Sequence, residues 1–399
     1  MFRNKIFSQS LYGVLDQGFS SLLLFGVNLY LARLSFFNEI GILALVISSI
    51  GIAHVLQQAI LERPMLIKKN ILARNIVLSR FLIVLLILVT NALYLYISSS
   101  SFGLNILFLI PWISLGLTQL SFNLLRIYFY SIEEEFKAFY MSLSSLIIIF
   151  FIIFLIHISD VFRLSYIILI ISLIKSLIIL YFLRNIRTPE LTELSIDTSK
   201  KQYFFLIIIS SSMFIKQKLP ILFLSTYAFS IVGIYEIIRN VTEILLMPFR
   251  PLSQTLLTYF STNLKTKNRL NIIFAFGGIG FLLTSIFSLL IRYIFEIFNI
   301  YDFYTLRINI ALSLFIFASI TIVPINSIFL STKRYKYEMV VKVLPVILFS
   351  SVLYILKIYD VEMIIIGIAV TTWLELVIAI GILIYKKINN KDKENIIFI

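Results

Sequence analysis

The stretch LSYIILIISLIKSLIILYFL, residues 164–183, decides the fold class of this chain. A helix needs about 20 mainly apolar residues to cross a lipid bilayer. This stretch has that length, and Lys175 is its one charged residue. It therefore predicts a membrane-spanning helix. Because a charge in lipid is costly, Lys175 is expected to face protein or a water-filled cavity.

Similar apolar stretches recur along the whole chain, separated by charged or polar breaks. The composition agrees, because 60% of the 399 residues are hydrophobic and 14% are charged, against roughly 25% charged residues in soluble domains. The eighth stretch is the weakest, since it contains three charged residues. We expect an all-α polytopic membrane protein of about twelve spans, at 8–32, 40–60, 78–97, 104–125, 141–158, 164–183, 203–225, 231–249, 271–292, 307–330, 339–357 and 362–385.

Basic residues are distributed unevenly over the connections between these spans. Twenty-five of the 34 Lys and Arg residues fall on one side, among them Arg126 and Lys342, and five fall on the other. Cytoplasmic loops are enriched in Lys and Arg, so both termini are expected in the cytoplasm. The formal net charge of +14 is then explained by orientation and by anionic membrane lipids, and it indicates no nucleic-acid partner.

Several kinds of chemistry are excluded by composition. The chain has no cysteine and only two histidines, His54 and His157, which excludes disulfides, thiol nucleophiles and a multi-histidine metal centre. No Gly-rich phosphate loop occurs, so nothing indicates an ATP-driven motor within the chain. We expect His54 to be an ordinary interior histidine, and we expect no cofactor and no bound metal.

The widest polar stretch on the cytoplasmic side divides the chain into halves. We predict an N-terminal six-helix bundle at 1–187, a cytoplasmic linker at 188–202, a C-terminal six-helix bundle at 203–388 and a cytoplasmic tail at 389–399. Transporters are commonly built from such internal repeats. The residues that open the second and eighth spans support this weakly, since Glu39-Ile40-Gly41-Ile42 is matched by Ile231-Val232-Gly233-Ile234.

Span eight carries the most informative charges. Glu236, Arg239 and Glu243 are spaced three and four residues apart, which places them on one helical stripe beside Asn240. The stripe indicates either a cavity wall, with a cation held between two carboxylates, or an internal salt bridge that locks two helices. Charged groups at membrane depth favour the cavity.

The other charged residues inside the spans are more isolated. Lys216 and Lys218 lie two residues apart, so both would reach one cavity only if Pro220 breaks their helix. Asp16 is either a proton or sodium site or a salt-bridge partner near the surface. The roles of Lys175 and of Glu375, in the last span, are left open between function and pairing with an unidentified residue.

Short motifs give the chain a family resemblance. It resembles the Wzx-type polysaccharide flippases of the multidrug/oligosaccharidyl-lipid/polysaccharide (MOP) exporter superfamily. The resemblance covers all twelve spans in layout and roughly the first seventy residues in motif. The residues that carry it are Asp16-Gln17-Gly18, Leu31-Ala32-Arg33, Glu39-Ile40-Gly41, Val232-Gly233-Ile234-Tyr235, Arg239 and Asn240.

This resemblance implies two six-helix bundles arranged in a V in the bacterial cytoplasmic (inner) membrane, with a central cavity. It implies a flippase, not an enzyme, that moves polyprenyl-diphosphate-linked oligosaccharide repeat units by ion-coupled alternating access for O-antigen, lipopolysaccharide or capsule biosynthesis. A polysaccharide polymerase and chain-length machinery are further expected partners. On this reading the cations that bind the diphosphate in the cavity are Lys216, Lys218 and Arg239. The amides that bind the sugars are Gln17, Asn28, Gln119, Asn123 and Asn240. The carboxylates that bind H⁺ or Na⁺ are Asp16, Glu236, Glu243 and Glu375.

Two alternatives stay open at this point. One is a MATE-like multidrug or small-molecule exporter of the same superfamily, although lysines within the membrane would repel cationic drugs. The other is a membrane glycosyltransferase or O-antigen polymerase. Such enzymes use sizeable external loops, whereas the longest external connection here, around 293–306, has about fourteen residues.

Overall fold

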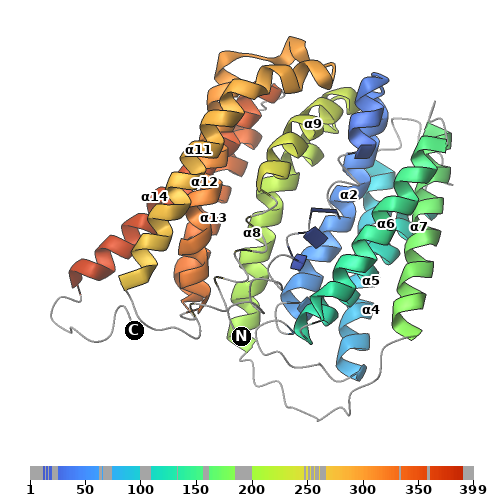
Figure 1. Cartoon of the computed structure of the whole chain (residues 1–399), viewed down its shortest axis with the longest axis horizontal. Helices are drawn as coiled ribbons and strands as arrows, with labels where there is room; N and C mark the ends of the chain where they lie inside the picture. Colours follow the sequence, from blue (N-terminus) through green and yellow to red (C-terminus); the bar gives the residue numbers. More distant parts are fainter. Residues whose placement is uncertain are drawn as a thin grey trace. The chain divides into compact units, whose positions relative to one another are not determined.

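The computed structural model is all α-helical over the residues that it describes (Figure 1). These are residues 12, 13, 15, 16, 18, 19, 26–62, 65, 74–98, 109–132, 134–155, 161–184, 200–246, 249, 252, 256, 260, 267–331, 334–356 and 360–389. The long helices are α2 Phe37–Gln57, α4 Arg74–Ser98, α5 Leu109–Ser131, α6 Glu135–Leu155, α7 Val161–Arg184, α8 Lys200–Leu224, α9 Phe229–Leu246, α11 Lys267–Ile297, α12 Leu306–Ser331, α13 Tyr335–Leu356 and α14 Val361–Asn389.

These helices correspond in order to the second through twelfth expected spans. The first span is represented by helical residues between 12 and 19 and by the helix at 26–33. The prediction of an all-α fold with about twelve helices is therefore confirmed. Helix α8 continues through Pro220 to Leu224, so the break that would let Lys216 and Lys218 reach one cavity is not seen.

Seven of the helices in the described ranges are long and apolar enough to cross a membrane: α2 with its extension to Glu62, α7, α8, α11, α12, α13 and α14. Their outward-facing side chains fit a lipid environment. On α11, for example, Phe274 is 75% exposed and Leu289 is 77% exposed. Large apolar side chains exposed in such numbers along one face indicate contact with lipid.

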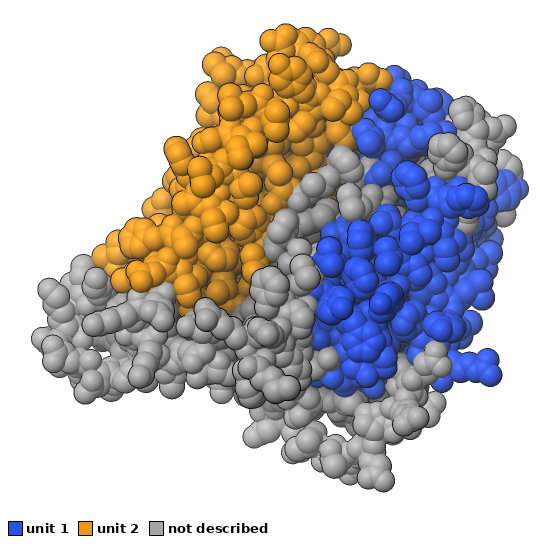
Figure 2. Space-filling view, in the orientation of Figure 1, with its two compact units in different colours: residues 1–214, 221–237 blue, residues 215–220, 238–399 orange. Residues whose placement is uncertain are grey.

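The chain folds into two compact units (Figure 2). The first comprises residues 1–214 and 221–237, and the second comprises residues 215–220 and 238–399. Helices α8 and α9 therefore contribute residues to both units. The predicted boundaries at 188–202 and 389–399 fall largely outside the described residues, and that division stays a prediction.

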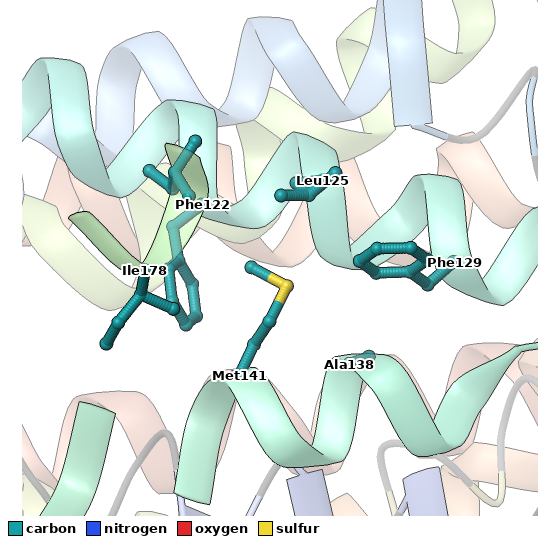
Figure 3. Packing of buried hydrophobic residues seen from close by; sticks show 7 residues of the cluster. Phe122, Leu125, Phe129, Ala138, Met141 and Ile178 are labelled. Atoms are coloured by element: carbon teal, nitrogen blue, oxygen red, sulfur yellow. The ribbon is translucent and has the colours of Figure 1, made fainter. Parts of the chain in front are cut away.

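The core of the first unit lies between α5, α6 and α7 (Figure 3). Phe122, Leu125 and Phe129 project from α5 at intervals of three and four residues, which places them on one face. They meet Met141 of α6 and Ile178 of α7. In the second unit the corresponding core joins α12, α13 and α14, and α12 packs against both α11 and α14 (Figure 1).

Helices α2 and α9 cross within the first unit at a pair of glycines. A Cβ atom on Gly41 would lie 2.0 Å from the carbonyl oxygen of Phe229, and one on Gly233 would lie 2.1 Å from that of Phe37. Gly41 lies four residues after Phe37, which Gly233 contacts, and Gly233 lies four residues after Phe229, which Gly41 contacts. The contact is thus reciprocal and runs from backbone to backbone, as small residues permit in membrane proteins. It involves the same two glycines whose surroundings suggest a repeat in the sequence.

Candidate functional site

Asp16 is the centre of a buried ionic cluster in the first unit. Its carboxylate is fully buried and accepts hydrogen bonds from Arg126 on α5, from Nε at 3.0 Å and from Nη2 at 2.5 Å. Ser142 of α6 donates to Oδ1 at 2.5 Å, and the hydroxyl of Tyr130 donates to Oδ2. A buried carboxylate needs such compensation, and a guanidinium can bind both of its oxygens.

This cluster corrects the expected place of Arg126. Counting basic residues assigned it to a cytoplasmic connection, but it lies inside α5 and is buried against Asp16. The apolar stretch ends at residue 125, whereas the helix continues to Ser131. The signal that could have revealed the pair is the stripe of Gln119, Asn123 and Arg126, which occupies one face of this helix.

Lys175 is hydrogen-bonded to a polar side chain of the same unit. Its Nζ donates a hydrogen bond to Oε1 of Gln119 and lies 5.4 Å from the centroid of the Phe122 ring. Gln119 in turn donates to Oδ1 of Asn123 at 3.3 Å. The two amides that were assigned to sugar binding are therefore engaged with each other and with a lysine.

The second unit holds a triad of two lysines and one carboxylate. Nζ of Lys216, on α8, lies 2.7 Å from Oε1 of Glu375 on α14. Nζ of Lys342, on α13, lies 2.6 Å from Oε2 of the same carboxylate. The side chains of all three are largely buried, with exposed fractions of 12%, 2% and 8% for Lys216, Glu375 and Lys342. The triad therefore carries one positive charge more than its own carboxylate compensates.

Lys342 is the second correction to the basic-residue count. It was expected in a cytoplasmic connection, yet it lies seven residues after the first residue of α13, Tyr335, and is buried. Glu375, which looked isolated in the sequence, is bound on both oxygens. The lysine could not be recognised from local sequence, because its partner is 33 residues away on another helix.

The remaining predicted residues are distributed over both units. On α9, Glu236 and Asn240 are buried, and Nη2 of Arg239 lies 3.4 Å from Oδ1 of Asn240. Lys218 and Asn28 are also buried. Gln17 lies outside the described residues. The assignment of these side chains to substrate or to a coupling ion stays a prediction, as do the roles of Asp16, Lys216, Glu243 and Glu375.

Two of these amides carry buried atoms that lack a hydrogen-bond partner in the described part of the chain. They are Oδ1 of Asn28 and Nδ2 of Asn240. A buried polar atom without a partner is unfavourable and is compensated when a ligand or water binds. Among the described residues, no group of three or more His, Asp or Glu side chains could hold a metal ion.

No family model and no curated protein matches the chain in sequence. Solved structures match it in fold. A MATE transporter in a bent conformation has a TM-score of 0.59 at 14% identity, over 97% of this chain and 95% of its own. Outward-facing and inward-facing structures, each of a multidrug resistance MATE family transporter of the MOP superfamily, have TM-scores of 0.57 and 0.55 at 14% and 15% identity. They cover 97% and 96% of this chain, and 96% and 94% of their own. This chain therefore has the fold of the MATE transporters of the MOP superfamily.

Proposed function

We propose that this chain is an ion-coupled flippase that moves polyprenyl-diphosphate-linked oligosaccharide repeat units across the bacterial cytoplasmic membrane, for surface polysaccharide biosynthesis. The observation that carries the proposal is the triad of Lys216, Lys342 and Glu375, in which two buried lysines share one carboxylate. A lipid-linked diphosphate is anionic, so it can bind a cluster in which two lysines share one carboxylate.

Charge also bears on the choice of substrate. Two like charges about 4 Å apart repel by about 4 kcal/mol at the effective dielectric constant near a protein surface. A cationic drug that approached the triad would meet this repulsion, whereas a diphosphate would be attracted by a similar amount. The buried amide atoms of Asn28 and Asn240 offer partners for sugar hydroxyls. The polyprenyl chain can stay in the bilayer while its head group crosses.

Alternating access is supported by the comparisons. Inward-facing and outward-facing transporters match the chain over almost its whole length. Asp16 and Glu375 are buried carboxylates that bind basic side chains, so protonation of either would release a basic side chain. Such protonation drives the cycle only if the two conformations bind the proton with different affinity.

A multidrug exporter is the second candidate, and it is favoured because the inward-facing and outward-facing structures that match the chain are of multidrug resistance transporters. A polymerase or glycosyltransferase is less well supported. The connection expected to be the longest external one spans only residues 298–305 between α11 and α12, with the short helix η4 Tyr301–Phe303. It leaves no room for a catalytic loop.

The test is deletion of the gene in the organism of origin, followed by analysis of lipid-linked intermediates. A flippase predicts that a complete repeat unit accumulates on the inner leaflet and that surface glycan is lost. Complementation with Lys216→Ala or Arg239→Ala is expected to restore little display, whereas Lys336→Ala, at an exposed position of α13, restores it fully. Normal surface glycan together with increased drug sensitivity would instead establish the multidrug exporter.

A further inference from the structure

A groove lies between α6 and α7 in the first unit. Its cavity has a volume of about 600 Å³, which is within the range of about 300–1,000 Å³ found for ligand sites. Its lining includes Phe136, Lys137, Tyr140 and Ser144 of α6, and Leu177, Tyr181 and Phe182 of α7. The groove is therefore large enough for a ligand, and aromatic side chains form much of its wall.

The groove begins at one end of the two helices and runs toward their middle. Because α6 begins at Glu135 and α7 ends at Arg184, Phe136 and Phe182 lie at its mouth. From Phe136 to Ser144 the groove extends about 12 Å along α6. Half of the hydrocarbon core of a bilayer is about 15 Å thick. The groove thus fits within one leaflet, and the distribution of basic residues predicts the cytoplasmic leaflet.

The wall of the groove suits a hydrocarbon chain. Tyr140, Leu177 and Tyr181 are each more than half exposed, and α7 is one of the helices apolar enough to cross a membrane. Ser144 is the lining residue of α6 farthest from the mouth, and its hydroxyl already donates to the carbonyls of Tyr140 and Met141. This hydroxyl needs no polar ligand, so an acyl chain can lie against it without loss of a hydrogen bond.

Both signs of charge are present at the mouth. Nζ of Lys137 lies 2.6 Å from Oε2 of Glu134, and it lies 5.6 and 5.9 Å from the ring centroids of Phe129 and Phe136. The side chains of Lys137 and Glu134 are 29% and 35% exposed. An ion pair as open as this contributes little to stability, so a ligand that offers partners to both charges can replace it.

A zwitterionic head group with a primary ammonium matches these charges. Its phosphate can bind Lys137, and Arg184, exposed three residues after Tyr181 at the end of α7, offers a second cation. Its ammonium can donate hydrogen bonds to Glu134, as a lysine does. An anionic head group without an ammonium would instead be repelled by Glu134 and Glu135. A trimethylammonium group has no N–H to donate.

We infer that this groove binds one phospholipid with a primary ammonium, of the phosphatidylethanolamine type, from the leaflet at the mouth. An acyl chain occupies the groove, the phosphate binds Lys137 and the ammonium binds Glu134. The inference does not rest on the proposed function, because it involves no transported substrate.

The absence of cysteine from the chain allows a direct test with one fluorophore on one introduced cysteine. Leu177→Cys places the label in the groove, and Leu289→Cys on α11, at a highly exposed position, is the control for ordinary contact with lipid. The full chain is placed in nanodiscs that contain increasing fractions of phospholipid with brominated acyl chains, which quench the fluorophore on contact. Brominated phosphatidylethanolamine, phosphatidylglycerol and phosphatidylcholine are compared.

At Leu177→Cys we expect phosphatidylethanolamine to reach half-maximal quenching at a mole fraction about threefold lower than the other two lipids, the effect of one exposed ion pair. At Leu289→Cys the three lipids are expected to quench equally. Glu134→Gln, combined with Leu177→Cys, should abolish the preference over phosphatidylglycerol, because the acceptor for the ammonium loses its charge. The matched control is Glu296→Gln, which opens a similarly exposed pair with Arg292 on α11 and should leave the preference unchanged.

Equal quenching by the three lipids at Leu177→Cys, or a preference for either of the other two, overturns the inference. An unchanged preference in Glu134→Gln overturns it as well. Displacement of the brominated lipid by an equimolar polyprenyl phosphate would assign the groove to the tail of the proposed substrate and also overturns it. If gene deletion leaves glycan display intact, the proposed function fails and the lipid site is unaffected.

Discussion

Glu375 is the residue whose replacement tests the second unit most sharply. Glu375→Gln keeps the shape of the side chain but removes the charge that Lys216 and Lys342 share at 2.7 and 2.6 Å. Removing one partner of a buried ion pair costs about 3–5 kcal/mol, because the remaining charge is left uncompensated in a poorly solvated place. Here two cations are left, so we expect at least that loss in the free energy of unfolding.

Replacing a lysine of the triad is expected to cost less stability than replacing Glu375. Lys216→Met leaves Glu375 paired with Lys342 and removes the excess positive charge, so its cost is expected to be below about 2 kcal/mol. A loss of 3–5 kcal/mol lowers the melting temperature by about 6–20 °C at the 2–4 °C per kcal/mol typical of domains of 150–250 residues. Glu375→Gln should therefore melt well below Lys216→Met.

Thermal unfolding of purified protein in detergent, followed by size-exclusion chromatography of the folded fraction, measures the difference. Glu362→Gln is the matched control on the same helix, because its partner Arg307 is 3.6 Å away and 80% exposed, and exposed pairs contribute about 1 kcal/mol or less. A Glu375→Gln protein that melts within about 2 °C of the wild type, or above Lys216→Met, would refute the assignment of Glu375 as the shared counter-ion.

Two further substitutions test the first unit by the same thermal assay. Gly41→Val would force a side chain into the carbonyl of Phe229, 2.0 Å from the Cβ position, and is expected to cost about 3 kcal/mol or more, the upper end of overpacking; Gly277→Ala, which meets nothing within 4 Å, should change little. Arg126→Met strands the buried carboxylate of Asp16 and is expected to cost about 3–5 kcal/mol, whereas the double variant with Asp16→Asn should recover most of that loss. Equal losses in the single and double variants would show that the guanidinium stabilises through packing and not through charge.

The helical fold could be predicted from sequence because most spans are long and apolar, and seven of the described helices meet the length and apolarity that a membrane crossing needs. The buried basic residues could not. The predicted fourth span ends at residue 125, directly before Arg126, and Lys342, near the start of the predicted span 339–357, was counted with the basic residues of a cytoplasmic connection. In both cases the basic side chain is buried because it pairs with a carboxylate that is distant in the sequence. Asp16 is 110 residues from Arg126, and Glu375 is 33 residues from Lys342.

The contact of Glu62 with His54 was missed for a related reason. Only a π-turn at the end of α2 brings it back to His54, and no periodic pattern in the sequence signals such a turn. By contrast, the polar stripe on α5 can be recognised in the sequence, because Gln119, Asn123 and Arg126 are spaced four and three residues apart. Gln119 and Asn123 connect Lys175 to His54, and Arg126 binds Asp16.

The crossing of α2 and α9 has a mechanical consequence. The atoms nearest to a Cβ on Gly41 or Gly233 belong to the backbone of the other helix, so a rotation of α2 about this point would leave that backbone contact in place. Helix α2 has 21 residues, which corresponds to a rod of about 31 Å. His54 lies 13 residues after Gly41, about 20 Å along the helix, so a rotation of about 10° about Gly41 would move it by roughly 3.5 Å. A small rotation at the glycine contact between α2 and α9 is thus amplified into a displacement of several ångströms at the other end of α2.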